Sequence, residues 1–187
     1  MKELLAYLDS IYPMTDGLKQ QFASVVKVKE LSKKSYWLKA GHVCRNACFI
    51  HKGLLRCFYE KDGHEICSWF MKEADVMISV ESFFTQKESY ESIQALEDST
   101  LFYISYSDLQ VLYQNHLEFN YIVRVLMERY YMMSEQRLFS MRMQRSQERY
   151  DYLFKHHPEL VLRVPAKYLA SYLGISEVTI SRIKATY

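Results

Sequence analysis

The side chains between Ser176 and Lys184 have the clearest chemical purpose in this sequence. Seven of them are of types that contact bases or phosphates: Ser176, Glu177, Val178, Thr179, Ser181, Arg182 and Lys184. Only Arg182 can donate the two parallel hydrogen bonds that distinguish guanine. We therefore interpret Arg182 as a base-reading residue and the hydroxyl groups and Lys184 as phosphate contacts. If Arg182 held a phosphate instead, Glu177 or Val178 would have to read the bases.

Two short helices joined by a tight turn would present these side chains. Pro165 suits a first helical turn, Gly174 suits a left-handed residue at a helix end, and Ser176 can cap the next helix. Small and apolar residues recur at the spacing of a seam between the two helices: Leu169, Ala170, Leu173, Ile175, Ile180 and Ile183. This pattern predicts a helix-turn-helix, a motif whose second helix enters the major groove of DNA.

The charges are spread in a way that agrees with a DNA-binding end. From Ser140 to Tyr187 there are eight Lys or Arg against four Asp or Glu, whereas the rest of the chain has sixteen against eighteen. The net charge of the 187 residues is only +2. The basic end is therefore the one that we expect to face phosphate.

The segment from Lys27 to Ser105 has the short runs of aromatic and β-branched residues that are typical of strands. The clearest predicted strands are Leu54–Tyr59 and Ile66–Phe70, and two more are predicted over Glu91–Leu96 and Thr100–Ser105. The Asp62-Gly63 pair favours a hairpin turn with positive φ between the first two. Two short helices are predicted before them, over Lys2–Tyr12 and from a cap at Thr15 or Asp16. The sequence thus predicts a β-roll, or jelly roll, after a helical start.

A long helix is predicted between Leu117 and Met143, and it is apolar on two opposed faces. We expect one face to cover the β-roll and the other to pack against a second copy. We assign the homodimer contact to Phe119, Val123, Leu126, Tyr130 and Met133. The opposite face has Tyr121, Val125, Met132, Phe139 and Met143. The alternative is a helix that is buried entirely within one chain.

Three segments resemble the cyclic-AMP receptor protein and fumarate-nitrate regulator (CRP/FNR) family. The first comprises Leu38–Gly41 and the following Phe49–Tyr59, the second is Tyr103–Leu109, and the third is Leu173–Ile183. The resemblance implies an α+β chain with a cyclic-nucleotide-binding-type β-roll over residues 1–115, a dimerisation helix over 116–143 and a helix-turn-helix domain over 144–187. It implies a transcription regulator that is not an enzyme, and it also places a guanine-reading Arg at the position of Arg182. Because the sequence stops soon after the second helix of the motif, we expect no wing there.

The sequence departs from the nucleotide-binding members at the phosphate-binding segment. Those members carry a Gly-Glu pair and then an Arg that pairs with the cyclic phosphate. This sequence has Asp75–Phe84 followed by Glu88–Ser92, with Glu88 and Glu91 near the Arg position. A phosphate would meet carboxylates there, so we do not expect cyclic AMP to bind. The pocket is expected either to be empty or to take an apolar or cationic effector, given the apolar and aromatic residues nearby: Phe70, Met71, Phe83, Phe84 and Tyr90.

The expected partners are double-stranded DNA, a second copy of the chain and, as a further candidate, RNA polymerase, with an unknown effector. No cofactor, metal or membrane is expected, and the absence of an eighteen-residue apolar run predicts a cytoplasmic protein. Four cysteines, Cys44, Cys48, Cys57 and Cys67, form no CxxC pair and are interpreted as buried thiols rather than as iron-sulfur ligands.

The sequence leaves two other interpretations of the protein's function open. A β-roll can also be a cupin-type metal enzyme, for which His42, His51 and His64 are the available ligands. The chain could also be a ligand-binding β-roll protein without DNA binding, since Glu177 stands where relatives often have a basic or amide side chain.

Overall fold

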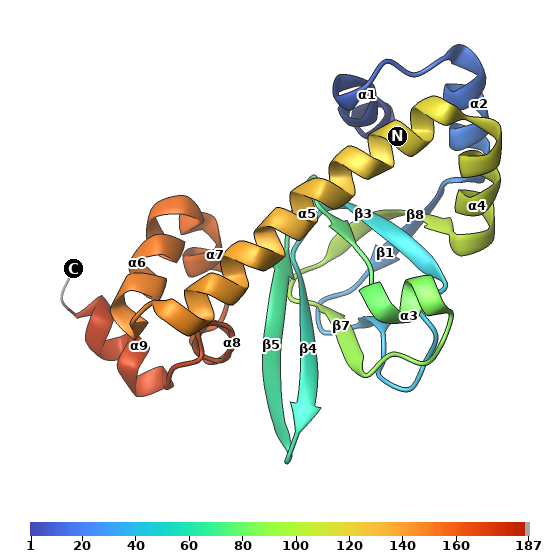
Figure 1. Ribbon diagram of the computed structural model, residues 1–187. Helices are drawn as coiled ribbons and strands as arrows, with labels where there is room; N and C mark the ends of the chain where they lie inside the picture. The colour runs from blue at the N-terminus through green and yellow to red at the C-terminus, as the bar shows by residue number, and fades with distance from the viewer. Residues whose placement is uncertain (186–187) are drawn as a thin grey trace.

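Two four-stranded antiparallel sheets form the N-terminal part of the chain, as the computed structural model of residues 1–185 shows (Figure 1). The strands are β1 (Lys27–Leu31), β2 (Tyr36–Leu38), β3 (Asn46–Lys52), β4 (Leu55–Lys61), β5 (His64–Met71), β6 (Val76–Met77), β7 (Glu91–Ala95) and β8 (Ser99–Ser105). One sheet has the order β1-β8-β3-β6 and the other β2-β7-β4-β5. This β-sandwich confirms the β-roll that the sequence predicts.

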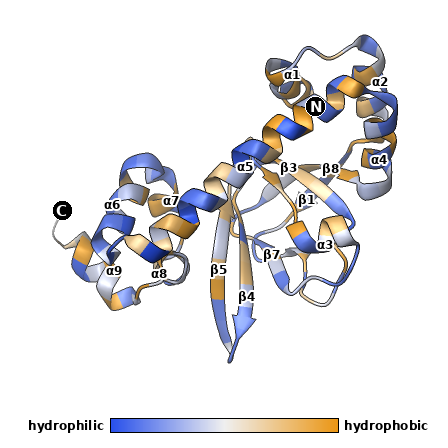
Figure 2. Cartoon of the chain, viewed as in Figure 1, coloured by the Kyte–Doolittle hydropathy of each residue, from blue (hydrophilic) through white to orange (hydrophobic). Residues whose placement is uncertain are grey.

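Helices lie before, within and after the sandwich. They are α1 (Lys2–Ile11), α2 (Asp16–Val25), α3 (Val80–Thr85), α4 (Tyr106–Asn115), α5 (Leu117–Met143), α6 (Ser146–His156), α7 (Pro158–Arg163), α8 (Ala166–Leu173) and α9 (Glu177–Lys184). The long helix α5 runs from the N-terminal helices, past the sandwich, to the C-terminal helices (Figure 1). Polar and apolar residues alternate along it (Figure 2). None of the helices within residues 1–185 has the length and apolar character that a membrane span needs.

The hairpin formed by β4 and β5 contacts both the core between the two sheets and the C-terminal helices. Its turn has Asp62 at φ 53° and Gly63 at φ 75°, the two positive φ values that the Asp-Gly pair predicts. A bulge lies between Cys57 and Phe58, where the register against β5 shifts. Because side chains alternate along a strand, each strand of the hairpin presents one face to the sandwich core and one face away from it.

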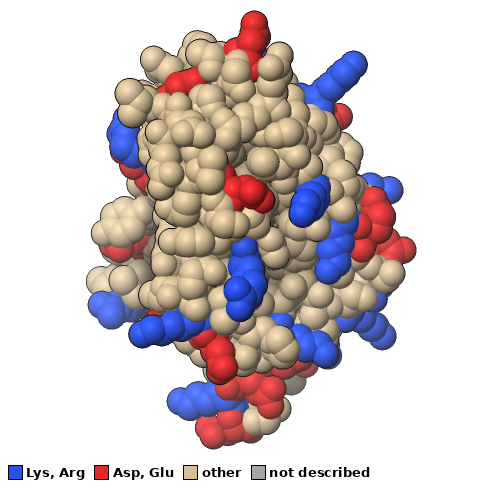
Figure 3. Space-filling view, turned by 90° about the vertical axis from the view of Figure 1, so that its right-hand side faces the viewer, with Lys and Arg blue, Asp and Glu red and all other residues tan. Residues whose placement is uncertain are grey.

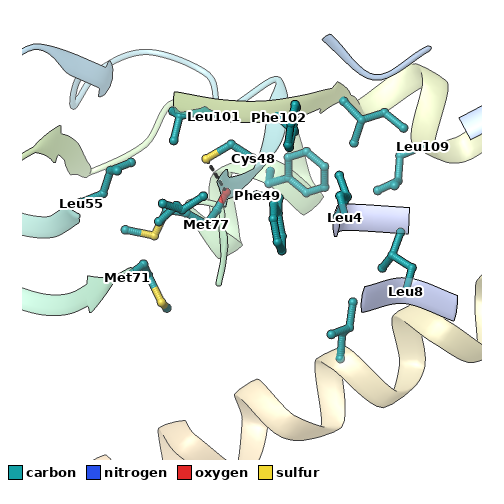
Figure 4. Close-up of a cluster of buried hydrophobic side chains, with 14 of the residues drawn as sticks. Leu4, Leu8, Cys48, Phe49, Leu55, Met71, Met77, Leu101, Phe102 and Leu109 are labelled. Carbon is teal, nitrogen blue, oxygen red and sulfur yellow. Dashed lines mark hydrogen bonds between the residues drawn. The ribbon is translucent and has the colours of Figure 1, made fainter. Parts of the chain in front are cut away.

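Buried apolar side chains form two clusters, one on each face of this hairpin. The first lies between the sheets and is closed by α1, α2, α4 and α5. Leu4 and Leu8 of α1 approach Phe49 and Phe102 there, and the Cys48 thiol donates to the Met77 carbonyl at 3.5 Å (Figure 4). The second cluster joins the outer face of the hairpin to the C-terminal helices. The β4–β5 hairpin is therefore a shared wall between the two cores.

Candidate nucleic-acid interface and effector cavity

Helices α8 and α9 form a helix-turn-helix with the predicted Gly174 turn and Ser176 cap, while Pro165 is the N-cap residue of α8 rather than part of its first turn. Helix α8 ends at Gly174, which has φ 64° and ψ 39°, and the Ile175 N–H donates to the Ala170 carbonyl at 3.0 Å. The Ser176 hydroxyl caps α9 by accepting from the Thr179 N–H at 3.1 Å. The predicted seam is buried: Leu169, Ala170, Leu173, Ile180 and Ile183 lie in the second cluster, with Ile175 packed against it.

The predicted DNA contacts lie on the side of α9 that faces away from this seam. Glu177, Val178, Ser181 and Arg182 are exposed, while Thr179 is half-buried. Ser176 is exposed, although capping already engages its hydroxyl. Within the described part of the chain, Arg182 has no hydrogen bond or ion pair, so its guanidinium is free to donate. The side chain of Lys184 lies outside the described residues.

The C-terminal helices dock on the outer face of the β4–β5 hairpin through a buried polar contact that the sequence analysis did not anticipate. Arg56 on β4 is only 1% exposed. Its guanidinium donates to Glu65 at 2.7 Å and to Gln94 at 2.7 Å and stacks 3.8 Å from the centre of the Tyr168 ring on α8. The Arg56 hydrogen bonds lower the pKa of the Glu65 carboxyl. Arg56 therefore fixes α8 against the sandwich.

Further contacts hold the same two parts together. The Ser171 hydroxyl on α8 accepts from the Cys67 N–H and donates to the Glu65 carbonyl, both at 2.9 Å. Arg163 on α7 forms ion pairs with Glu73 at 2.9 Å and Glu97 at 2.8 Å. The bonds from Arg163 lower the pKa of Glu73 to about 2. The helix-turn-helix thus has a defined orientation relative to the β-roll.

The residues that the sequence assigned to dimer contact lie on the face of α5 that packs against the β-sandwich of the same chain. Phe119 and Leu126 are buried in the first core, Val123 and Tyr130 pack against it, and Met133 is half-buried. The opposite face is the exposed one: Tyr121, Met132, Phe139 and Met143 are 43%, 59%, 60% and 70% exposed. The sequence pattern shows two apolar faces but not which of them the sandwich covers, and this is why residues of the covered face were assigned to the dimer contact.

A cavity of about 270 Å³ lies between the sandwich and α5. Met71, Phe83, Phe84 and Tyr90 line it, as the sequence analysis expects of an effector pocket. Phe70 does not: it lies in the second cluster, with its ring 5.1 Å from that of Tyr172. Phe70 and Met71 are neighbours on β5, so their side chains leave the strand on opposite faces. The expectation for Phe70 is therefore wrong.

The charged groups that line this cavity are acidic. Glu81 and Glu91 line it, and in the described part of the chain no Lys, Arg or His does. Glu88, which the sequence analysis placed beside the phosphate position, is exposed and lies outside the lining. Burial, followed by the nearby Glu91 carboxylate, raises the pKa of Tyr59 to about 12. Sequence reasoning missed Tyr59 and Trp69 in this wall, although Tyr59 shares a strand face with Cys57 on β4 and Trp69 shares one with Met71 on β5.

The cysteines and histidines do not assemble into a metal centre in the part of the chain that the structure describes. Cys44, Cys48, Cys57 and Cys67 are buried free thiols. Burial raises the pKa of all four thiols, so they are poor nucleophiles.

Figure 3 shows the side of the molecule away from the C-terminal helices. Basic and acidic side chains are interspersed there, and they form no continuous basic surface on this side.

Comparisons with known proteins agree with this architecture. Residues 28–116 match the family described as cyclic nucleotide-binding domain. The fold is similar to that of FixK2 from Bradyrhizobium japonicum (TM-score 0.75, 15% identity, 87% of this chain and 84% of that one). It is also similar to that of the c-di-GMP responsive global regulator CLP from Xanthomonas campestris (TM-score 0.72, 16% identity, 92% and 91%).

A third similar structure is a putative transcriptional regulator of the CRP/FNR family from Eubacterium rectale (TM-score 0.71, 15% identity, 93% of this chain and 85% of that one). A search of curated proteins found no match in sequence. The chain thus contains a domain of the cyclic nucleotide-binding type and has the fold of full-length CRP/FNR regulators, from the β-sandwich through the long helix to the C-terminal helices.

Proposed function

We propose that this chain, whose fold is that of the CRP/FNR regulators, is a transcription regulator that binds a palindromic operator as a homodimer in the cytoplasm. The observation that carries the proposal is the exposed outer face of α9, where Arg182 has no partner in the described part of the chain. A recognition helix needs an exposed donor of this kind on the face that enters the major groove. The basic charge of the C-terminal segment supports the same proposal.

The dimer is proposed to form through the exposed face of α5. Tyr131 and Leu138, which are 67% and 45% exposed, extend the apolar surface of Tyr121, Met132, Phe139 and Met143. Six exposed apolar side chains along one helix indicate a contact with another protein. Packing two copies along α5 would cover these side chains and would give two recognition helices related by a twofold axis, as a palindrome requires.

DNA binding is tested by selecting duplexes from a random pool with the full-length protein at low salt. We expect enrichment of two inverted half-sites spaced by about one helical turn, roughly 10 base pairs, and an affinity that falls steeply with salt. Recovery of the pool without any enriched sequence would favour the alternative, a ligand-binding β-roll protein that does not bind DNA.

Cyclic AMP is expected not to bind at micromolar concentration. Its phosphate would enter a cavity whose charged lining residues are Glu81 and Glu91, and the lining offers no described cation to pair with it. Calorimetric titration of the full-length protein with cyclic AMP should give no heat of binding in this range. A micromolar dissociation constant would contradict the prediction.

A further inference from the structure

The Glu91 carboxylate is buried at the cavity without a counter-charge. The residue is 8% exposed. The Cys57 thiol donates to its Oε2 atom at 2.7 Å, and Oε1 accepts no hydrogen bond from any described residue. No Lys or Arg whose side chain the structure describes forms an ion pair with it. A carboxylate that lines a cavity and is paired with no cation of the protein is a suitable partner for a cation supplied from outside.

Aromatic side chains surround the same end of the cavity. The rings of Tyr59 and Tyr90 lie 5.5 Å apart, and Trp69 also lines the wall. Aromatic faces attract organic cations, and most strongly where water is excluded. A tyrosine phenol is neutral at physiological pH, and the pKa of Tyr59 is raised further, to about 12, so this ring adds no charge.

The rest of the cavity is apolar. Leu126 and Phe119 of α5, Met71 of β5 and Leu109 of α4 contribute to its wall. A ligand that filled the whole cavity would need a hydrocarbon or aromatic body beyond its charged group. A fully neutral apolar molecule would leave Glu91 uncompensated, and an anion would be repelled by both glutamates.

We propose that this cavity binds a small organic cation, with an ammonium or similar group against Glu91 and an apolar body against Trp69, Met71 and Leu126. The proposal does not depend on DNA binding. It extends the proposed function by assigning the chemical class of the effector.

The wall that contacts this ligand is also the wall on which the C-terminal helices dock. Cys57 and Trp69 face the cavity, while Arg56 and Phe70 on the same strands face α8. Arg137 on α5 adds a second connection, because its guanidinium lies 5.8 Å from the Trp69 ring centre and donates to the Tyr172 carbonyl at 2.8 Å. Ligand contact with Trp69 would therefore be transmitted to α8 through directly packed side chains.

The test compares three probes that differ only in their head group: 4-phenylbutylamine, 4-phenylbutan-1-ol and 4-phenylbutyrate. A full-length Trp37→Phe variant leaves Trp69 as the fluorophore, since Trp37 lies outside the lining of this cavity. Trp69 fluorescence and calorimetry are measured without DNA, so a failure here leaves the DNA-binding proposal intact. We expect the amine to bind about tenfold more tightly than the alcohol, and the carboxylate not to bind.

Glu91→Gln should weaken binding of the amine by about tenfold and leave the alcohol within twofold, because the variant removes the charge and keeps the shape. Glu88→Gln is the matched control, since Glu88 is exposed and outside the cavity, and should leave all three probes unchanged. Equal affinity for the three probes, no binding of the amine, or an amine affinity that Glu91→Gln does not change would each overturn the proposal. The head-group comparison uses the native cavity, so it decides the matter even if Glu91→Gln fails to fold.

Discussion

A Met132→Glu, Phe139→Glu double variant should be a monomer and should bind the operator roughly a hundredfold or more weakly, because linked half-site binding is lost. The two side chains are 59% and 60% exposed on the outer face of α5, so the substitutions leave the folded monomer intact. In the proposed dimer they would place four carboxylates in an apolar interface, where unpaired charges are strongly unfavourable. Light scattering measures the mass, and a titration with the selected palindrome measures the affinity.

The matched control places two glutamates at exposed apolar positions away from α5. Val28 on β1 and Val111 on α4 are 55% and 44% exposed, so Val28→Glu, Val111→Glu makes the same change in charge. This control should stay dimeric and bind the operator as the unmodified chain does. If the α5 variant remained a dimer of normal affinity, the interface would have to lie elsewhere. Variants at Phe119 or Leu126 cannot decide the question, since these side chains belong to the core.

Local signals in the sequence were sufficient for the turns and helix ends. The Asp62-Gly63 pair, the left-handed Gly174 and the Ser176 cap each depend on a few neighbouring residues, and all three adopt the predicted conformation. Runs of aromatic and β-branched residues sufficed for β4, β5, β7 and β8, whereas β1, β2, β3 and β6 were not predicted individually. These features are encoded in residue type and spacing, which is the information that a single sequence contains.

Features that depend on which surfaces meet could not be predicted. Both faces of α5 are apolar, and only the position of the sandwich decides that Phe119 is buried and Phe139 is exposed. Phe70 was misplaced for a related reason, because the strand pattern does not reveal that the C-terminal helices cover the second face of the hairpin. That docking also explains why Arg56, a residue type that is rarely fully buried, is 1% exposed.

The sequence predicted the acidic lining of the cavity only in part. The lack of an Arg in the phosphate-binding segment pointed away from nucleotides, and the acidic lining agrees with that. The sequence analysis placed Glu88 and Glu91 together, yet only Glu91 reaches the cavity. The second carboxylate comes from Glu81 on α3, whose position depends on how α3 packs against the sheets.

Arg182→Ala should cost about 1–3 kcal/mol of binding free energy on the operator, which corresponds to roughly fivefold to 150-fold in affinity. It should also flatten the preference for guanine at one base pair in each half-site. Arg182 is exposed on α9 and unpaired in the described part of the chain, so its removal should not affect folding. The planar guanidinium can contact guanine O6 and N7 together, which no other side chain on this face can do. Titrations against the operator and a scrambled duplex at several salt concentrations measure both effects.

Two further variants separate base reading from phosphate binding. Arg182→Lys keeps the charge but loses the paired donors, so we expect it to lose sequence preference nearly as Arg182→Ala does while retaining the salt dependence. Lys184→Ala should instead weaken both duplexes equally and lower the salt slope by about one. If Arg182→Ala weakened the operator and the scrambled duplex to the same extent, Arg182 would be a phosphate contact. Base reading would then fall to Glu177 or Val178, which lie exposed on the same face of α9.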